Sequence, residues 1–185
     1  MGDLPLCVSV PLWFILPPEM LRPSYLIALL ILTSCASTPP PPAKIDSFRG
    51  QYHFLSNFYP AEIQFEGLTY PDVEHAYQSA KTTDMAGRRR IDAQPTPADA
   101  KRAGESFPPR PDWPQIKFDV MLQCVRYKFT HHPELAQQLL ATGNAYLEEG
   151  NTWNDRIWGV YQGQGQNHLG KILMQVRAEL QQHSQ

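Results

Sequence analysis

Three side chains that can do chemistry stand at regular intervals in the segment Pro71–Lys81, which reads Pro-Asp-Val-Glu-His-Ala-Tyr-Gln-Ser-Ala-Lys. Glu74, Gln78 and Lys81 occupy positions i, i+4 and i+7, and in a helix these positions share one face over two turns. A carboxylate can move a proton, and an amine can attack a carbon atom or donate a proton. The spacing therefore predicts a helix with one chemically active face.

Each of these side chains also has a simpler interpretation. A single glutamate on a helix is usually a surface carboxylate that pairs with a lysine or with water. Lys81 is a nucleophile only where burial or a neighbouring cation keeps part of its amine neutral; otherwise it binds phosphate or holds Glu74 ionised. The spacing alone leaves these roles open, so the surrounding elements and the other motifs have to separate them.

The residues just before this helix predict how it is positioned. The runs 63–65 and 68–70 begin and end with apolar residues and flank the pair Glu66-Gly67, which is typical of the turn between two antiparallel strands. Asp72 then precedes the helix, where its side chain can cap the first turn and its charge suits the positive helix end. A hairpin should therefore lead directly into the helix.

Most of the remaining chain is predicted to be helical. Cap residues, prolines and apolar periodicity place further helices at 98–104, from 113 to a stop at 131–133, at 134–142 and at 167–181. A turn after a short extended run is expected within 45–59. The expected architecture is α+β: one mainly helical domain, residues 45–182, with a small N-terminal β-hairpin.

Composition limits the class of protein. The chain has 185 residues, a formal net charge of −2 and 42% hydrophobic residues, which suits one compact domain with a short appendage. The basic cluster Arg88–Arg90 is more typical of a solvated helix face than of a nucleic-acid surface. Cys7, Cys35 and Cys124 are odd in number and widely separated, so they define neither a disulfide framework nor a zinc site. Cys124 is expected in a helix core.

Residues 1–44 differ from the rest and are expected to form a leader and a proline-rich linker. Prolines interrupt the early apolar stretches, so the run of ~20 apolar residues that spans a membrane is missing. From Met20 the chain has the layout of a secretion signal, and the tetrapeptide 32–35 resembles the lipobox of bacterial lipoproteins. Two interpretations stay open: a lipid anchor at Cys35 with translation from Met20, or a wrongly assigned start ahead of a cytosolic domain.

Several short motifs follow one another along the chain. They are the segments 55–60, 74–78 with Lys81, 110–113 with Lys117 and Met121, 128–129, 154–159, 165–170 and 173–174 with Arg177. Together they resemble the NADAR (NAD- and ADP-ribose-associated), or YbiA-like, family over about residues 45 to 180. The resemblance implies a YbiA-like fold and an N-glycosidase, an enzyme that cleaves the bond between the anomeric carbon of a ribose and a nitrogen atom.

The resemblance implies one of two substrates. Some family members split a phosphoribosylamino-pyrimidine, an early riboflavin-pathway intermediate, and others remove ADP-ribose from guanine in nucleic acid. We favour the small molecule, because the sequence has no strongly basic face for a polynucleotide. A module that only binds ADP-ribose or a nucleotide is the alternative from another class. We expect no cofactor and no metal, since no histidine and acid stand at ligand spacing, and family resemblance implies a cytoplasmic location.

The resemblance also suggests which residues are catalytic. Cleavage of the C–N bond gives the sugar oxocarbenium character, which a carboxylate stabilises, and Glu74 is the first candidate. Lys81 becomes a candidate to form a Schiff base with an opened sugar. Asp155 is the second carboxylate: it either partners Glu74 or caps its own backbone in an Asx-type turn.

The candidates for substrate binding are spread along the chain. Trp113 and Trp158 either stack on the base or fill the core. Asn57 either reads a sugar hydroxyl or closes a turn. Phe58 and Gln78, in the same motifs as Asn57 and Glu74, are also expected to contact the substrate.

Four further residues are candidates for contacts to the phosphate or through the backbone. Arg49 and Gly50 precede the first motif and are expected near phosphate. Gly159 would let the backbone come close to a ligand. Asn167 is expected to cap the final helix, whose N-terminus would then offer an anion site.

Overall fold

The computed structural model describes residues 40–183, which belong to one compact unit, Pro39–Gln185. Met20 and Cys35, on which the expected secretion signal depends, lie outside the described residues. None of the helices in the described range is long and apolar enough to cross a membrane.

The described chain is mainly helical, with short paired strands. In chain order the elements are β1 (Lys44–Ile45), η3 (Gly50–Leu55), β2 (Ile63–Phe65), β3 (Leu68–Tyr70), α1 (Val73–Ser79), α2 (Met85–Asp92), α3 (Pro97–Glu105), α4 (Trp113–His131), α5 (Pro133–Ala141), β4 (Tyr146–Leu147), β5 (Gly150–Asn151), β6 (Val160–Tyr161) and α6 (His168–His183). β1 pairs with β4 and β5 with β6 in parallel, whereas β2 and β3 are antiparallel. This arrangement confirms the predicted α+β class.

The hairpin β2–β3 forms as its sequence predicts. Ile63 lies opposite Tyr70, and both side chains are buried. Between the strands, Glu66 and Gly67 have positive φ angles of 48° and 78°. Two successive residues with positive φ give a turn whose twist matches that of the flanking strands.

Helix α1 is buried on every side. All residues of Val73–Ser79 are buried, because the helix packs against α2, α3 and α4. A buried polar group that lacks a hydrogen-bond partner is costly. Glu74, His75 and Gln78 consequently need hydrogen-bond partners inside the protein.

The predicted helical stripe is shorter than expected. α1 ends at Ser79, and Lys81 lies in the following turn. The Lys81 amide donates to the Gln78 carbonyl (3.2 Å), and the Thr82 amide donates to the Ser79 carbonyl (3.3 Å). Such i to i+3 bonds tighten the chain at a helix end. Lys81 therefore approaches the site from a turn and not from the helix itself.

The segment 45–59 also differs from the predicted extended run. Residues Gly50–Leu55 form the 3₁₀ helix η3, and Gly50 has a positive φ of 56°, which glycine adopts readily. Phe54 and Leu55 are both buried. Winding the segment brings these adjacent side chains into the core, which an extended run with alternating sides would not do.

The basic cluster 88–90 divides between the interior and the solvent. Arg88 is 5% exposed; its Nε donates to the Thr82 carbonyl (2.8 Å), and its guanidinium pairs with Glu66. Arg89 and Arg90 are exposed. Only these two fit the predicted solvated face, because the ion pair with the hairpin draws Arg88 inward.

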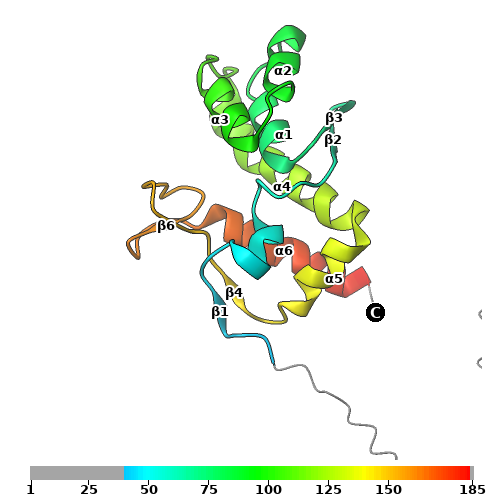
Figure 1. Cartoon of the computed structure of the whole chain (residues 1–185), viewed down its shortest axis with the longest axis vertical. Coiled ribbons are helices and arrows are strands. Elements are labelled where there is room, and N and C mark those ends of the chain that lie inside the picture. Colours follow the sequence, from blue (N-terminus) through cyan, green and yellow to red (C-terminus); the bar gives the residue numbers. More distant parts are fainter. Residues whose placement is uncertain (1–39, 184–185) are drawn as a thin grey trace, which may run out of the picture. The chain divides into compact units, whose positions relative to one another are not determined.

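Helix α4 connects the two groups of helices, since it contacts α1 as well as α5 and α6 (Figure 1). Cys124 and Phe129 of α4 are fully buried, as are Leu169 and Leu173 of α6, so Cys124 lies in a helix core as predicted. Truncating a leucine in such a core typically costs ~2–5 kcal/mol. The packed part of α4 thus provides a rigid support for its first turns, which face α1.

Candidate active site

A cavity of about 720 Å³ lies between α1, one side of α3, the first turns of α4 and the segments 56–58 and 149–158. The predicted site residues that line it are Asn57, Phe58, Glu74, Gln78, Lys81, Trp113, Asp155 and Trp158. Small-molecule sites usually have volumes of ~300–1,000 Å³. The fold thus brings widely separated motifs together around a space that fits a nucleotide-sized ligand.

Glu74 lies on the first turn of α1 and is 6% exposed. Its Oε1 accepts a hydrogen bond from Gln78 Nε2 (2.6 Å), and its amide donates to the Asn57 carbonyl (3.3 Å). Burial raises the pKa of Glu74, while the Gln78 hydrogen bond and the charges of Lys101 and Lys81 oppose the rise. The carboxyl group therefore exchanges protons at a higher pH than an exposed glutamate does.

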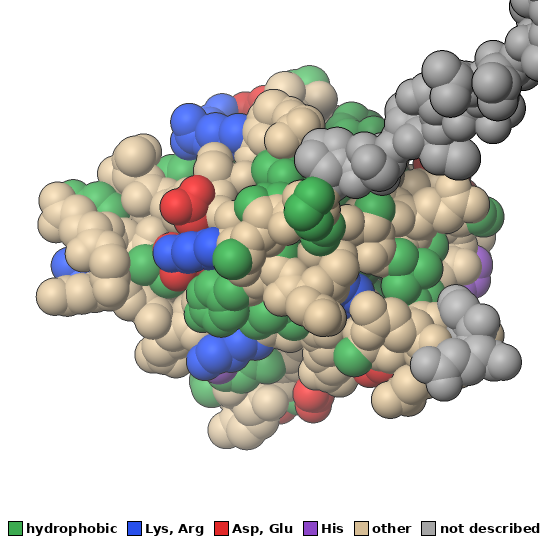
Figure 2. Space-filling view, turned by 90° about the horizontal axis from the view of Figure 1, so that it is seen from below, with side chains coloured by type: hydrophobic (Ala, Val, Ile, Leu, Met, Phe, Trp, Pro, Cys, Tyr) green, Lys and Arg blue, Asp and Glu red, His purple; other side chains and the backbone are tan. Residues whose placement is uncertain are grey.

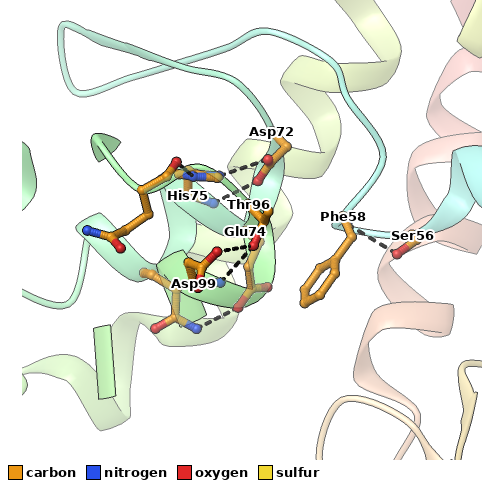
Figure 3. Close-up of polar contacts among 9 residues, drawn as sticks. Ser56, Phe58, Asp72, Glu74, His75, Thr96 and Asp99 are labelled. Atoms are coloured by element: carbon orange, nitrogen blue, oxygen red, sulfur yellow. Dashed lines mark hydrogen bonds and ion pairs between the residues drawn. The ribbon is translucent and has the colours of Figure 1, made fainter. Parts of the chain in front are cut away.

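Asp72 and His75 fix the start of α1 (Figure 3). Asp72 accepts hydrogen bonds from the His75 amide (2.9 Å) and ring Nδ1 (2.8 Å), and His75 Nε2 donates to the Gln94 carbonyl (3.1 Å). Burial lowers the pKa of His75, but the hydrogen bond and charge of Asp72 outweigh it, so the pKa is raised. Because each ring nitrogen faces an acceptor, His75 is an imidazolium. It orients α1 and does not line the cavity.

Gln78 is held against Glu74 by the close approach of α3. Its side chain is buried, and its Oε1 has no hydrogen-bond partner within residues 40–183. A β-carbon at Gly104 of α3 would collide with this amide. α3 can therefore pack on α1 only because residue 104 lacks a side chain.

Lys81 reaches the cavity from the turn after α1. Its carbonyl accepts a hydrogen bond from the Arg110 amide (2.7 Å), which fixes the turn, and its Nζ lies 5.9 Å from the centre of the Tyr77 ring. Burial lowers the pKa of Lys81, against the opposing charges of Glu74 and Glu105. A larger fraction of this amine is neutral than in an exposed lysine, which is the condition for nucleophilic attack.

Asp155 lines the cavity, but its carboxylate is engaged by the backbone. Oδ1 accepts hydrogen bonds from the amides of Ile157 and Trp158, both at 2.9 Å. The backbone of Asp155 is in turn bonded to the Asn151 side chain at 3.0 and 2.7 Å. This is the Asx-type turn that the sequence left as one of two interpretations, and it orders the loop that carries Trp158.

Aromatic rings form one wall of the cavity. The Tyr77 ring centre lies 5.0 Å from that of Trp113 and 5.3 Å from that of Trp158, and Phe118 lies 5.4 Å from Trp158. Trp113 is 8% exposed and belongs mainly to the core, whereas Trp158 is half-buried. These ring contacts hold Trp158 in one orientation, so it offers a rigid apolar surface to a flat ligand.

Lys128 holds the loop that carries Asn57. The lysine is 1% exposed, and its Nζ donates to the Ser56 carbonyl (2.9 Å). Burial lowers the pKa of Lys128 to about 7. Asn57 Nδ2 donates to Met121 Sδ (3.5 Å) on α4. These contacts fix segment 56–58 at the edge of the cavity.

Four of the predicted residues do not line the cavity. Arg49 and Gly50 lie at the start of η3 and are exposed. Gly159 is buried against the backbone and carboxyl group of Glu149. The buried Asn167 side chain accepts from the Glu149 amide (3.1 Å) and donates to a carbonyl of β4 (2.9 Å), so it does not cap α6. Gly159 and Asn167 instead support the segment that carries Glu149.

Other side chains line the cavity but were not predicted. They include Lys101, Lys117, Glu149 and Trp153. Trp153 is 51% exposed although it lines the cavity, so its ring is open to a ligand. A lysine on a helix or a glutamate beside a turn is common on any surface, so only the packing of α3 and segment 149–158 beside α1 distinguishes these residues.

Comparison with known proteins identifies the family. The NADAR domain family matches residues 46–181. A riboflavin biosynthesis protein of Vibrio vulnificus is 41% identical over 134 residues, and the N-glycosidase YbiA of Escherichia coli is 40% identical over 132 residues. The chain belongs to the NADAR family.

The alignment with this NADAR chain covers a different fraction of each of the two relatives. The alignments cover 71% of this chain and 36% of the Vibrio protein, but 70% of this chain and 82% of YbiA. The NMR structure of Escherichia coli YbiA matches with a TM-score of 0.68 and 37% identity, over 77% of this chain and 88% of that one. The fold of this NADAR domain is therefore that of YbiA.

The cavity falls within the part of the chain that the family shares. Every segment that lines it lies inside residues 46–181. Within this NADAR domain, the cavity combines a buried glutamate, further acids, amines and an aromatic wall. Such a set of groups can bind a flat ring joined to a charged sugar and can transfer protons at their junction.

Proposed function

We propose that this NADAR domain is an N-glycosidase that hydrolyses the bond between ribose C1 and the amino nitrogen of a phosphoribosylamino-pyrimidine, an intermediate of riboflavin synthesis, and releases ribose 5-phosphate. The names of the relatives, N-glycosidase YbiA and riboflavin biosynthesis protein, support this reaction and this small-molecule substrate. The observation that carries the proposal is the buried Glu74 carboxyl, bonded to Gln78, in one cavity with Lys81.

Glu74 has the surroundings needed to stabilise the transition state. Breaking the C1–N bond leaves positive charge on the ribose. A fixed carboxylate in a buried site stabilises such a charge more strongly than it would in water. Because the charge develops only as the bond breaks, this interaction favours the transition state over the bound substrate.

Lys81 has two roles that fit its position. In the first, its amine attacks the sugar carbon and water later releases the sugar, a route favoured by its lowered pKa. In the second, its positive charge holds Glu74 ionised while water attacks directly. Both roles require Lys81 beside Glu74, and chemical trapping of a sugar adduct on Lys81 distinguishes them.

The remaining lining residues suit the two ends of the substrate. Lys101, Arg102 and Lys117 line the cavity and supply positive charge for the 5-phosphate. Trp153 and Trp158 line it too and can stack on the pyrimidine. These five residues lie on α3, α4 and the loop 152–158, so substrate binding depends on elements other than α1.

The charge distribution favours a small substrate over a polynucleotide. The net charge of the chain is −2. On the face that Figure 2 shows, Lys and Arg side chains are scattered among apolar and acidic ones and do not gather into one broad patch. Nucleic-acid binding normally depends on such a patch. ADP-ribosyl-guanine contains the same type of bond, so it is the alternative substrate to test.

The test is a substrate comparison with the purified full chain. Incubation with the phosphoribosylamino-pyrimidine should release ribose 5-phosphate, and incubation with ADP-ribosylated DNA should release ADP-ribose slowly or not at all. Glu134→Gln, an exposed acid of α5, serves as a control that keeps full activity. Release of ADP-ribose alone would assign the other substrate, and tight binding with neither product would make the domain a binding module.

From the family alone, we also infer a cytoplasmic location. Labelling of producing cells with a fatty-acid analogue tests this inference. Label that depends on Cys35, and is lost in Cys35→Ala, would contradict it and support the lipoprotein interpretation instead.

A further inference from the structure

The leaving nitrogen of the proposed reaction needs a proton, and the cavity offers several acids. Oδ1 of Asp155 already accepts two backbone N–H groups, which occupies it as an acceptor. Glu74 accepts a hydrogen bond from Gln78 and lies in the field of two lysines, and these offset part of the effect by which burial disfavours its charged form. Glu105 is exposed. The remaining acid is Glu149.

Glu149 is held rigidly at the cavity wall. Its amide donates to Asn167 Oδ1 (3.1 Å), and its carbonyl accepts from the Val160 amide (2.8 Å). Its carboxyl group rests on Gly159, where a β-carbon would lie only 3.2 Å from Oε2. The fixed backbone and the missing side chain at residue 159 let the carboxyl group line the cavity.

The Glu149 carboxyl differs from those of Glu74 and Asp155 in its hydrogen bonds. Within residues 40–183, no backbone or side-chain group donates a hydrogen bond to it. A carboxyl group without donors lacks hydrogen bonds that would stabilise its negative charge, and in its neutral form it can itself donate an O–H. It is therefore suited to giving a proton to a ligand in the cavity.

We propose that Glu149 is the general acid that protonates the leaving nitrogen; this inference rests on the N-glycosidase function proposed above. As the C1–N bond breaks, its electron pair stays on the nitrogen, which takes the Glu149 proton. A water oxygen bonds to C1 and gives its proton to the Glu74 carboxylate. Exchange with solvent then returns a proton to Glu149 and removes one from Glu74. The nitrogen needs the same proton if the Lys81 amine attacks first.

The electrostatics of the cavity support this assignment. Burial raises the pKa of Glu149 to about 8; the negative charges of Asp155 and Glu74 add to the rise, and the positive charge of Lys101 opposes it. At neutral pH Glu149 is therefore mostly protonated. The two carboxyl groups differ in their surroundings, because Gln78 donates a hydrogen bond to Glu74 and no group of residues 40–183 donates one to the Glu149 carboxyl. Acid and base roles at one glycosidic bond require such a difference.

Two substrates separate proton donation from other roles. The first is the phosphoribosylamino-pyrimidine, whose amine must be protonated as it leaves. The second is 4-nitrophenyl ribofuranoside 5-phosphate, whose nitrophenolate leaves without a proton. The test variant is Glu149→Gln. Its matched control is Glu148→Gln, because Glu148 is the adjacent glutamate but pairs with Lys44 (3.0 Å) and does not line the cavity.

We expect Glu149→Gln to lower kcat/KM for the pyrimidine substrate by ~10²–10⁴-fold, the usual contribution of a general acid. The nitrophenyl substrate should be affected less than about tenfold, since its leaving group needs no proton. The wild-type rate with the pyrimidine should fall above about pH 8, the pKa of Glu149, and this decline should disappear in Glu149→Gln. Glu148→Gln should behave like the wild type with both substrates.

Two results would overturn the inference. One is a Glu149→Gln variant with unchanged activity and an unchanged alkaline decline; the other is an equal loss with both substrates, which would mean a structural role. If Glu149→Gln fails to fold, Glu149→Asp replaces it as the test variant, because aspartate keeps a carboxyl group. Glu149→Asp should lower the rate and keep the alkaline decline. An unchanged rate in Glu149→Asp would contradict the inference. Failure of the wild type to cleave the pyrimidine substrate would reject the N-glycosidase proposal itself.

Discussion

Gln78 donates a hydrogen bond from Nε2 to Oε1 of Glu74 at 2.6 Å, one turn apart on a helix that is buried on every side. Hydrogen bonds to charged groups contribute more than neutral ones, ~1.5–3 kcal/mol. The bond offsets part of the cost of burying the carboxylate, and it limits how far burial raises the pKa of Glu74. Gln78 thus connects the packing of α1 to the protonation of the catalytic candidate.

Removing the Gln78 donor should shift the acidic side of the pH dependence of kcat/KM to higher pH. In Gln78→Leu the pKa of Glu74 loses a lowering contribution, so Glu74 becomes ionised only at higher pH. The pH dependence of kcat/KM should shift upward on its acidic side. Gln175→Leu is a control, because Gln175 also donates to a glutamate four residues away, Glu179 (3.0 Å), but on the exposed face of α6. Equal profiles for the two variants would contradict a role for Gln78.

The His75 imidazolium should make stability depend on pH. Its pKa is raised in the folded protein above the ordinary ~6.5, so its stabilising contribution is complete below about pH 6.5 and is lost as the pH rises through the folded-state pKa. Asp72→Asn keeps an acceptor for the helix cap but removes the negative charge. We expect a smaller fall in the free energy of unfolding, measured with urea between pH 6 and 9, in this variant than in the wild type.

An unchanged pH dependence in Asp72→Asn would show that another group is responsible. NMR titration of the His75 ring should show a lower pKa in the variant than in the wild type.

Trapping with borohydride should decide between the two roles of Lys81. Because burial lowers the pKa of this amine, we expect reduction during turnover to leave a sugar adduct on Lys81, detected by mass spectrometry of the digested protein. Lys81→Arg keeps the charge but cannot form an imine, so it should give no adduct and lose at least ~10²-fold in rate. An active Lys81→Arg variant, with no adduct in the wild type, would leave only the electrostatic role.

Trp153 should contribute to substrate binding more than to catalysis. Trp153 is 51% exposed and lines the cavity, and stacking of one base on an aromatic side chain is worth ~1–3 kcal/mol. Trp153→Ala should therefore raise KM by roughly five- to a hundredfold with a small change in kcat. Trp153→Phe keeps a ring and should recover most of the affinity. A KM that does not change in Trp153→Ala would place the base elsewhere, with Trp158 as the next candidate.

Local sequence signals predicted the elements whose boundaries depend on residues close to them in the sequence. The Glu66-Gly67 turn and the cap at Asp72 lie where they were expected, because each depends on neighbouring side chains and backbone groups. The family motifs predicted the family and the fold, which the comparisons confirm. The turn at Lys81 was missed because its cause is the tight end of α1 and the contact with Arg110, almost thirty residues away.

The cavity itself could be predicted only in part. Glu74 and Trp158 were predicted as site residues because each lies in a short motif that resembles the NADAR family. Glu149 was missed because its position at the cavity wall depends on Asn167 and Gly159, which come from later segments of the chain. These two were predicted as ligand contacts, yet the structure places them behind Glu149, where they hold its backbone and leave room for its carboxyl group. The roles of all these residues, and the expected independence from metals, stay predictions.

The most direct test of the account is the turnover of phosphoribosylamino-pyrimidine by Glu74→Gln. Glutamine keeps the size of the side chain but carries no charge, so release of ribose 5-phosphate should fall by several orders of magnitude while calorimetry still detects substrate binding. Wild-type rates in Glu74→Gln would contradict the account, because the buried carboxylate would then have no part in breaking the C1–N bond.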